Sequence, residues 1–136
     1  MDPIEVRPEG GDRYRIAIRG HEVTVDQPVD DGGTDAGPTP TELFVAGLAS
    51  CIAFYGGRYL RRHGISERGF EVDAAFAFAD RPARVGGIEL AVRLPQGFRP
   101  GRRSAFLAVL EHCTVHNSIV STPLIQIALD AGDRAA

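Results

Sequence analysis

The chain has 136 residues, the length of one domain, and 43% of them are hydrophobic, which is enough for a core of ordinary proportions. Its 15 basic and 18 acidic residues leave a net charge of -3 and are scattered without a basic block. Nucleic acid is therefore not an expected partner, because phosphate binding needs a concentrated positive face. The absence of lysine removes Schiff-base chemistry.

The N-terminus has neither the basic start nor the apolar stretch of a secretory signal. The longest apolar run, residues 43–55, is shorter than the roughly 20 residues that span a bilayer. These features predict a soluble cytoplasmic protein. In a reducing compartment its two cysteines are expected to be free thiols, ligands or redox groups rather than a structural disulfide.

The N-terminal quarter of the chain predicts an antiparallel meander of three short strands. They cover residues 4–7, 14–19 and 22–25 and are separated by turn-forming residues. Residues 26–38 consist almost entirely of Asp, Gly, Pro and Thr. We expect a loop there, because this stretch is too polar to pack as an element of its own.

A long helix is predicted to begin at Pro40. Thr39 can cap it, proline suits the first helical position, and Glu42 completes a Thr-x-x-Glu capping box. Residues 43–54 are apolar on every side, which is typical of a helix buried all round at the centre of a structure, and after Tyr55 the helix turns polar. The helix is expected to run for about six turns and to end at Gly64.

Small residues recur at three- and four-residue spacing along this helix, so another backbone could approach it closely. We interpret the stripe as a helix-helix contact, which a second subunit could supply. Its members are Ala46, Ala49, Ser50, Ala53, Gly56 and Gly57.

The second half of the chain predicts two strands, a helix and a final strand. The strands cover residues 70–79 and 88–94 and are joined through a turn at 81–87. A helix opens at Pro100 and leads to His112 and Cys113, and a last strand covers residues 124–129. The order β-β-β-α-β-β-α-β predicts one α+β domain over residues 1–136.

Cys51 and Cys113 are the candidate reactive residues. Each could be only a small buried hydrophobe, which is a common role for a free cysteine. A redox role would need one thiol held ionised, because the thiolate attacks a peroxide oxygen, and a second thiol to resolve the sulfenic acid. Because Cys51 lies in the middle of a helix, an arginine would have to reach it to supply the positive charge.

Other chemistries have weaker signals. His112 and His116 flank Cys113, but a structural zinc needs four ligands at recurring spacing, and the sequence offers few candidates to complete the set. We therefore predict no metal. The chain has no Gly-x-Ser-x-Gly elbow of a serine hydrolase, and its glycine-rich loop lacks the Walker lysine.

Residues 26–51, DQPVDDGGTDAGPTPTELFVAGLASC, resemble the signature of the osmotically inducible protein C and organic hydroperoxide resistance (OsmC/Ohr) family. In that family a glycine-rich loop leads through a proline into a central helix that carries the peroxidatic cysteine. Residues 113–118 resemble the family's second motif, a cysteine followed by a polar turn that contains asparagine. The matching positions of the first motif are Gly33, Gly37, Pro40, Leu43, Ala46, Ala49 and Cys51.

The resemblance implies an intertwined homodimer, in which antiparallel sheets surround long central helices and two active sites lie at the subunit interface. It also implies a cysteine-based peroxidase that acts on organic or hydrogen peroxides in oxidative-stress defence, without a cofactor. Cys51 would become a sulfenic acid and Cys113 would condense with it. A dithiol electron donor would then restore both thiols.

The sequence departs from the family pattern at one position. The best-characterised members carry a glutamate directly after the helix-starting proline, where it pairs with a catalytic arginine, but Thr41 stands there in this chain. Glu42 follows one residue later, about 100° around the helix, so it is not expected to inherit the role. The family arginine comes from the N-terminal strands or the following loop, where Arg13 is our candidate ahead of Arg15 and Arg19. The pattern resembles a branch of the family that lacks this glutamate.

Two other functions stay open on the sequence. One is a dimeric module that binds a small hydrophobic molecule in a pocket lined by Phe44, Leu48 and Tyr55, without efficient peroxidase activity. The other is a metal-binding regulator.

Overall fold

A computed structural model describes residues 2–131 of the chain. Three strands come first, followed by a long helix, a two-stranded hairpin and two short helices. In chain order the elements are β1 (Glu5–Gly10), β2 (Arg13–Ile18), β3 (His21–Val25), the 3-10 turn η1 (Val29–Asp31), α1 (Pro40–Arg62), β4 (Glu71–Ala79), β5 (Arg84–Arg93), the 3-10 turn η2 (Pro100–Arg102), α2 (Arg103–Leu110) and α3 (Thr114–Val120).

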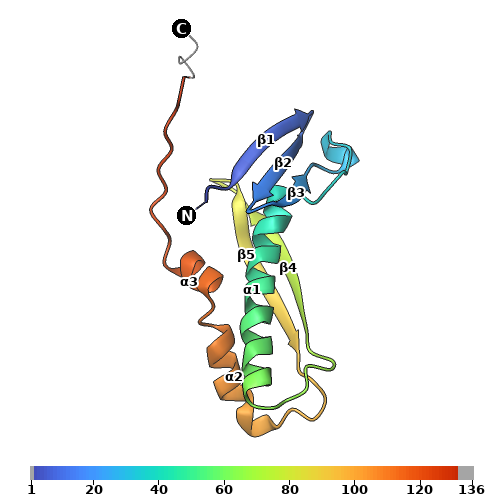
Figure 1. Ribbon diagram of the computed structural model, residues 1–136, viewed down its shortest axis with the longest axis vertical. Coiled ribbons are helices and arrows are strands. Elements are labelled where there is room, and N and C mark those ends of the chain that lie inside the picture. Colours follow the sequence, from blue (N-terminus) through green and yellow to red (C-terminus); the bar gives the residue numbers. More distant parts are fainter. Residues whose placement is uncertain (1, 132–136) are drawn as a thin grey trace.

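The two sheets are antiparallel and separate from each other. One has the order β1-β2-β3, and the other consists of β4 and β5 alone. The long helix α1 lies along the β4–β5 hairpin, while the N-terminal sheet stands at the N-terminal end of α1 (Figure 1). The helices α2 and α3 pack beside α1, so α1 is the element around which the others are arranged.

The sequence predicts most sharply where α1 begins, at Pro40 after the cap residue Thr39, and this prediction is confirmed. The Thr39 hydroxyl accepts a hydrogen bond from the Glu42 backbone N–H at 3.0 Å, and the Glu42 carboxylate accepts one from the Thr39 N–H at 2.8 Å. Two backbone donors that the first turn would leave unpaired are thereby satisfied. At the other end the chain leaves the helix through Gly64, which has a φ of 65°.

The prediction that α1 is buried on every side is wrong for the isolated chain. Val45, Leu48 and Leu60 are buried, but the rings of Phe44 and Phe54 are exposed. The 23 residues of α1 are long and apolar enough to cross a membrane, a criterion that a core helix of a soluble protein also meets. One side of α1 contributes to the core of this chain. The other side carries apolar residues that are exposed to solvent.

The core lies between α1, α2 and the β4–β5 hairpin, and Phe106 of α2 is at its centre. Its ring centroid is 5.3 Å from that of Tyr59, 5.2 Å from that of Phe98 and 6.0 Å from that of Phe70. Phe106 is buried, and contacts of this kind stabilise aromatic clusters beyond the area they remove from water. This cluster holds α2 in place against α1.

The predicted stripe of small residues divides into two parts. Gly56 serves the core of its own chain, since a Cβ added there would lie 2.7 Å from the Phe70 ring and 3.1 Å from Leu110. Farther toward the N-terminus of α1, the stripe borders an open groove between α1 and β4. The small residues in that groove are Ala46, Ala49, Ser50 and Ala53.

The C-terminal part of the chain differs from the prediction. Residues 113–118 are expected to be a cysteine followed by a polar turn, but residues 114–120 form the helix α3, and Cys113 caps it by accepting a hydrogen bond from the His116 N–H. The predicted strand at 124–129 is wrong for the isolated chain, because these residues run away from the body and pair with no strand (Figure 1). A strand needs a neighbour for its backbone groups, and none is within reach here.

The loop between β3 and α1 is built around the carboxylate of Asp26, which is only 1% exposed. It accepts hydrogen bonds from the Thr34 hydroxyl at 2.6 Å, the Ala36 N–H at 3.1 Å and the Gln27 N–H at 2.8 Å. These bonds favour the ionised form, the Thr34 hydroxyl most of all, and lower the pKa of Asp26 to about 2.

Two glycines permit this loop to close. A Cβ on Gly33 would lie 2.0 Å from the Gln27 carbonyl oxygen, and one on Gly37 would lie 2.2 Å from the Thr24 carbonyl oxygen. Backbone therefore occupies the space that any side chain would need. The two glycines are required by close packing, not by an unusual φ angle.

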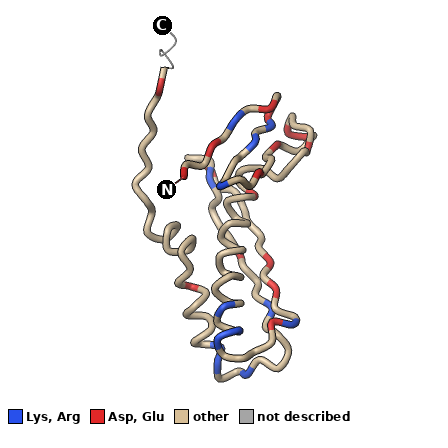
Figure 2. Tube along the Cα trace, viewed as in Figure 1, with Lys and Arg blue, Asp and Glu red and all other residues tan. Residues whose placement is uncertain are grey.

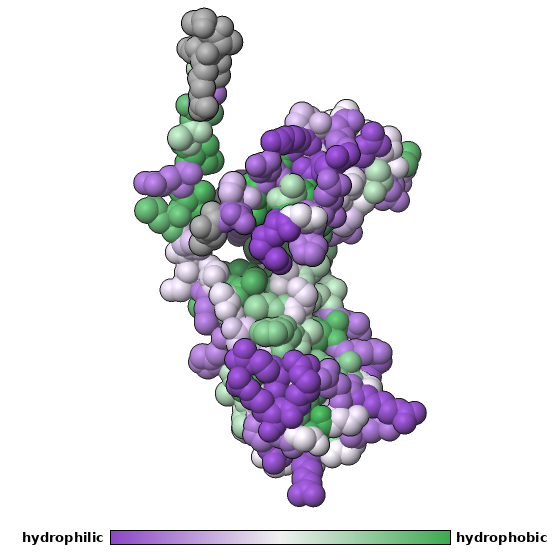
Figure 3. Space-filling view, in the orientation of Figure 1, coloured by the Kyte–Doolittle hydropathy of each residue, from purple (hydrophilic) through white to green (hydrophobic). Residues whose placement is uncertain are grey.

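The surface is divided by charge and polarity. Arginines gather where α1 ends and α2 begins (Figure 2). The space-filling view shows a more apolar surface between the hydrophilic ends of the molecule, and apolar atoms along the C-terminal segment (Figure 3). Four large side chains of that segment are exposed, namely Leu124, Ile125, Ile127 and Leu129.

We predict that Asp26→Asn lowers the melting temperature at pH 7, because the amide group places N–H donors against the donors that now surround the carboxylate. Since folding lowers the pKa from 3.8 to about 2, the native carboxylate stabilises the fold above pH 4, and this stabilisation is lost as the pH falls through 3.8 toward 2. The melting-temperature difference between the two proteins should therefore shrink over that range. A constant difference from pH 7 to pH 2 would contradict the assignment.

Candidate functional site

Cys51 lies in the middle of α1, on the side that faces α2 and α3. Its side chain is half-buried and packs against the core that contains Cys113. The position follows from the capped start of α1, since the capping box fixes where the helix begins and thereby which side of it carries residue 51. Cys51 is thus held against the core while part of its surface stays exposed.

Cys113 lies directly before α3 and is completely buried, with 0% of its surface exposed. Its sulfur accepts a hydrogen bond from the His116 N–H at 3.2 Å. Burial raises the pKa of Cys113, the neighbouring Cys51 thiol raises it further, and the His116 N–H opposes the rise. Cys113 is therefore a protonated thiol at neutral pH.

The structure brings the two predicted cysteines together although they are far apart in sequence. The Cys51 side chain packs against the core cluster that contains Cys113, near enough for one thiol to affect the ionisation of the other, and both cysteines are free thiols. The sequence alone could not establish this contact, because it depends on how α3 packs against α1.

Tyr55 and Thr114 join the elements that carry the two thiols. Their hydroxyls share a hydrogen bond of 2.9 Å, and each residue is close in sequence to one cysteine. Tyr55 is one helical turn after Cys51, and Thr114 directly follows Cys113. The bond therefore fixes α3 against α1 at the level of the thiols.

Arg13 lies in β2 of the N-terminal sheet, and its guanidinium donates a hydrogen bond to the Glu9 carbonyl oxygen at 3.3 Å. Arg15 pairs with Glu9 at 2.5 Å, and Arg19 is exposed at the turn that follows β2. None of the arginines among residues 2–131 forms a hydrogen bond with Cys51 or Cys113. Within one chain, the structure does not bring Arg13 to the thiols.

Glu42 is occupied by its role as a helix cap. Its carboxylate accepts the Thr39 N–H and lies more than two turns before Cys51 on α1. Its role in the helix cap is therefore established, and the expectation that it does not inherit the role of the glutamate that Thr41 replaces stays a prediction.

The histidines near Cys113 do not converge with it on one point. The His112 Nδ1 is 2.6 Å from the Ala108 carbonyl oxygen, and the His116 Nδ1 is buried without a hydrogen-bond partner. Among residues 2–131 there is no group of three or more His, Cys, Asp or Glu side chains that could hold a metal ion.

The hydrophobic pocket expected from Phe44, Leu48 and Tyr55 is divided between two sites. Phe44 and Leu48 line a groove of about 370 Å³ that α1 forms with β5 and α3. Tyr55 faces a different cavity, between α1 and α2. The groove that contains Phe44 is largely apolar, and His116 is its one ionisable side chain.

Sequence reasoning did not identify Tyr55, Thr114 and His116 as neighbours of the thiols. It considered Tyr55 only as part of a hydrophobic pocket and His116 only as a possible metal ligand. A signal existed for Tyr55, because a residue four positions after a cysteine shares its side of a helix. Thr114 and His116 were hidden by the interpretation of residues 113–118 as a turn, since their roles depend on α3 being a helix.

The comparisons with known proteins identify the family and the fold of the chain. Residues 32–128 match the family model described as OsmC-like protein. The chain is 26% identical to a Psychrobacter arcticus protein whose description names an osmotic stress induced and detoxification response, with a TM-score of 0.79 over 87% of this chain and 88% of that one. No curated protein sequence matches the chain.

Two less similar structures share the fold. An organic hydroperoxide resistance protein from Legionella pneumophila is 19% identical, with a TM-score of 0.63 over 88% of this chain and 90% of that one. The organic hydroperoxide resistance protein OhrB of Bacillus subtilis is 18% identical, with a TM-score of 0.62 over 89% and 93% of the two chains. At these identities the likeness shows the fold alone.

We predict that Glu42 supports the helix and takes no part in thiol chemistry. Glu42→Gln keeps an oxygen that can accept the Thr39 N–H, so the rate of thiol loss to a hydroperoxide should stay within about twofold of the unchanged protein. Thr39→Ala removes the other half of the cap and should cost about 1 kcal/mol of folding free energy without changing that rate. A tenfold slower rate in Glu42→Gln would show that the carboxylate acts on the thiols.

Proposed function

Since this chain belongs to the OsmC-like protein family, we propose that it is a cysteine-based peroxidase that reduces organic or hydrogen peroxides in the cytoplasm. Relatives described as organic hydroperoxide resistance proteins share its fold. The observation that carries the proposal is the packing of a half-buried thiol, Cys51, against the core cluster that contains a fully buried one, Cys113.

The roles of the two cysteines follow from their surroundings. The Cys51 thiolate attacks the terminal oxygen of a hydroperoxide, the O–O bond breaks, and the alcohol leaves after it takes up a proton, so that Cys51 becomes a sulfenic acid. The protonated Cys113 thiol then displaces water from that sulfenic acid, which forms a disulfide. A dithiol donor reduces the disulfide by exchange and is itself oxidised to a disulfide.

A cation is needed beside Cys51 to favour its thiolate, and we propose that Arg13 supplies it from a second copy of the chain. Arg13 is on the N-terminal sheet, which stands at the end of α1 away from its middle (Figure 1). In a homodimer whose chains are intertwined, the N-terminal sheet of one chain could cover the thiols of the other.

The homodimer itself is supported by the apolar surface that one chain leaves open. Residues 124–129 belong to neither sheet of the described part of the chain, and Ile127 and Leu129 are 88% and 97% exposed. Both edges of the two-stranded β4–β5 sheet are also without a neighbour among residues 2–131. An unpaired apolar segment and an open sheet edge are complementary, and joining them between two copies would satisfy both.

A second candidate function has one observation in its favour. The largely apolar groove beside Phe44 and Leu48 has a volume of about 370 Å³, at the lower end of the range for small-molecule sites. A dimeric module that binds a hydrophobic molecule there would need no reactive thiol. It would be favoured if both cysteines reacted with peroxide no faster than free cysteine.

We predict that Cys51→Ser lowers the turnover of tert-butyl hydroperoxide at least ~100-fold, because it removes the nucleophile. Cys113→Ser is the matched control. It should still react with one equivalent of peroxide, but it should stop at a sulfenic acid that dimedone traps on Cys51. Full turnover by Cys51→Ser, followed in a coupled assay with a dithiol donor, would overturn the assignment.

We also predict that the protein sediments as a dimer and that Ile127→Asp weakens the dimer at least ~100-fold, because a charge would be buried at the interface. In an isolated chain the same change is harmless, since Ile127 is exposed. The neighbouring Gln126→Asp serves as the control for added charge. The proposed dimer would be contradicted if the protein without substitutions stayed monomeric at high concentration. It would also be contradicted if Ile127→Asp left the dimer affinity the same.

A further inference from the structure

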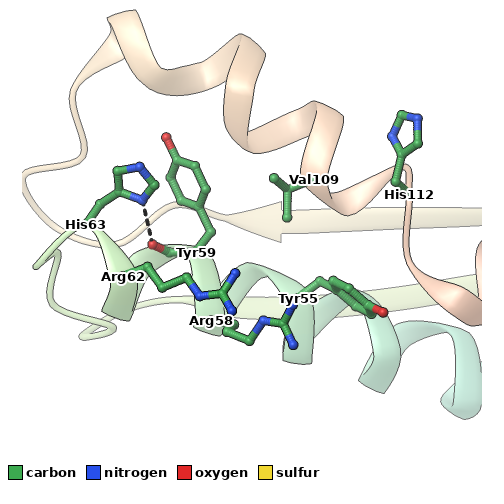
Figure 4. Close-up of a pocket in the computed structure, with 7 residues that line it drawn as sticks. All are labelled: Tyr55, Arg58, Tyr59, Arg62, His63, Val109 and His112. Carbon is green, nitrogen blue, oxygen red and sulfur yellow. Dashed lines mark hydrogen bonds between the residues drawn. The ribbon is translucent and has the colours of Figure 1, made fainter.

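A second cavity lies between the C-terminal half of α1 and α2, apart from the apolar groove beside Phe44. Its volume is about 440 Å³, which suits a small organic molecule. On one side α1 supplies Tyr55, Arg58, Tyr59 and Arg62, and on the other side lie Val109 and His112 (Figure 4). Neither cysteine lines this cavity.

The positive charge in this cavity is not neutralised by the chain. No acidic residue lines it, and neither Arg58 nor Arg62 forms an ion pair within residues 2–131. Arg61, between Arg58 and Arg62 in the sequence, instead pairs with Glu67 at 2.7 Å outside the cavity. Arginines near the end of a helix are favoured by its dipole, but the dipole does not explain why two unpaired guanidinium groups border one cavity.

The remaining walls are formed mostly by flat rings. These are the rings of Tyr55, Tyr59, His63 and His112. The Arg58 guanidinium lies over the Tyr55 ring, 5.4 Å from its centroid, and this contact holds it at the wall of the cavity. Tyr59 is buried and stacks on the His63 ring at a centroid distance of 4.1 Å, while Val109 adds aliphatic surface. Such walls suit a planar or aliphatic group.

We propose that this cavity binds a small organic oxyanion, a carboxylate or phosphate on a flat apolar body, whose charged group Arg58 and Arg62 hold. Guanidinium groups donate paired hydrogen bonds to such groups, and they bind more strongly where water is partly excluded. The site would lie beside the thiols, since Tyr55 lines the cavity and also bonds to Thr114. Its occupancy requires no redox step, so this proposal goes beyond the proposed peroxidase function.

The test is titration calorimetry of the full chain with benzoate and phenyl phosphate, with benzamide as the neutral probe of nearly the same shape. We expect at least one of the two anions to bind about tenfold or more tightly than benzamide, with an affinity that falls as salt is added. Equal binding of benzamide, or no binding of either anion at millimolar concentration, would overturn the proposal. These outcomes are measured on the unchanged protein and do not depend on whether a variant folds.

Variants then locate the site. Arg58→Gln and Arg62→Gln should each weaken binding of the anion about tenfold. Arg61→Gln removes the same charge from the same helix but leaves the cavity wall intact, so it should weaken binding less than about twofold. An equal loss in all three variants would show only a long-range effect of charge and would overturn the assignment. Peroxide turnover, measured in parallel, distinguishes failure of this site from failure of the thiol pair.

Discussion

The packing of α3 against α1 is the constraint on which the proposed activity depends. Two thiols distant in sequence can act on each other only if the short helix after Cys113 is held at the level of Cys51. The hydrogen bond between Tyr55 and Thr114 does this directly, at 2.9 Å. The aromatic cluster around Phe106 does it indirectly, because it fixes α2, the element that leads into Cys113.

In the proposed mechanism, the difference in burial between the two cysteines matches their two different roles. A thiol that attacks peroxide has to be reached from solvent, and Cys51 is the partly exposed member of the pair. A resolving thiol needs only to meet its partner, and burial raises the pKa of Cys113, which favours its protonated form. At the N-terminal end of α1, the hydrogen bonds to the Asp26 carboxylate and the capping box set the residue at which the helix begins. They thereby set the position of Cys51 along it.

The sequence predicted the features that depend on interactions between residues close together in the chain. The capping box at Thr39, the extent of α1 and the hairpin of β4 and β5 follow from spacing and turn chemistry within a few residues. The contact of Cys51 with Cys113 came from a family resemblance, not from spacing. The cavity around Arg58 and Arg62 could not be predicted, because it exists only where α2 faces α1.

The errors also have physical causes. Residues 124–129 have the composition of a strand, but composition does not supply the neighbour that a strand needs, and one chain does not provide it. The same reasoning explains why a helix that looks buried all round exposes Phe44 and Phe54. Both features are what a chain built for a partner would show when it is considered alone.

The central claim, that Cys51 and Cys113 form one redox pair, is tested most directly by treating the reduced protein with one equivalent of hydroperoxide per chain and mapping its peptides by mass spectrometry. The account predicts the loss of both thiols in each chain and a linked peptide pair that joins Cys51 to Cys113. Oxidation of Cys51 to a sulfinic acid with Cys113 still free, or no reaction of either thiol, would contradict it.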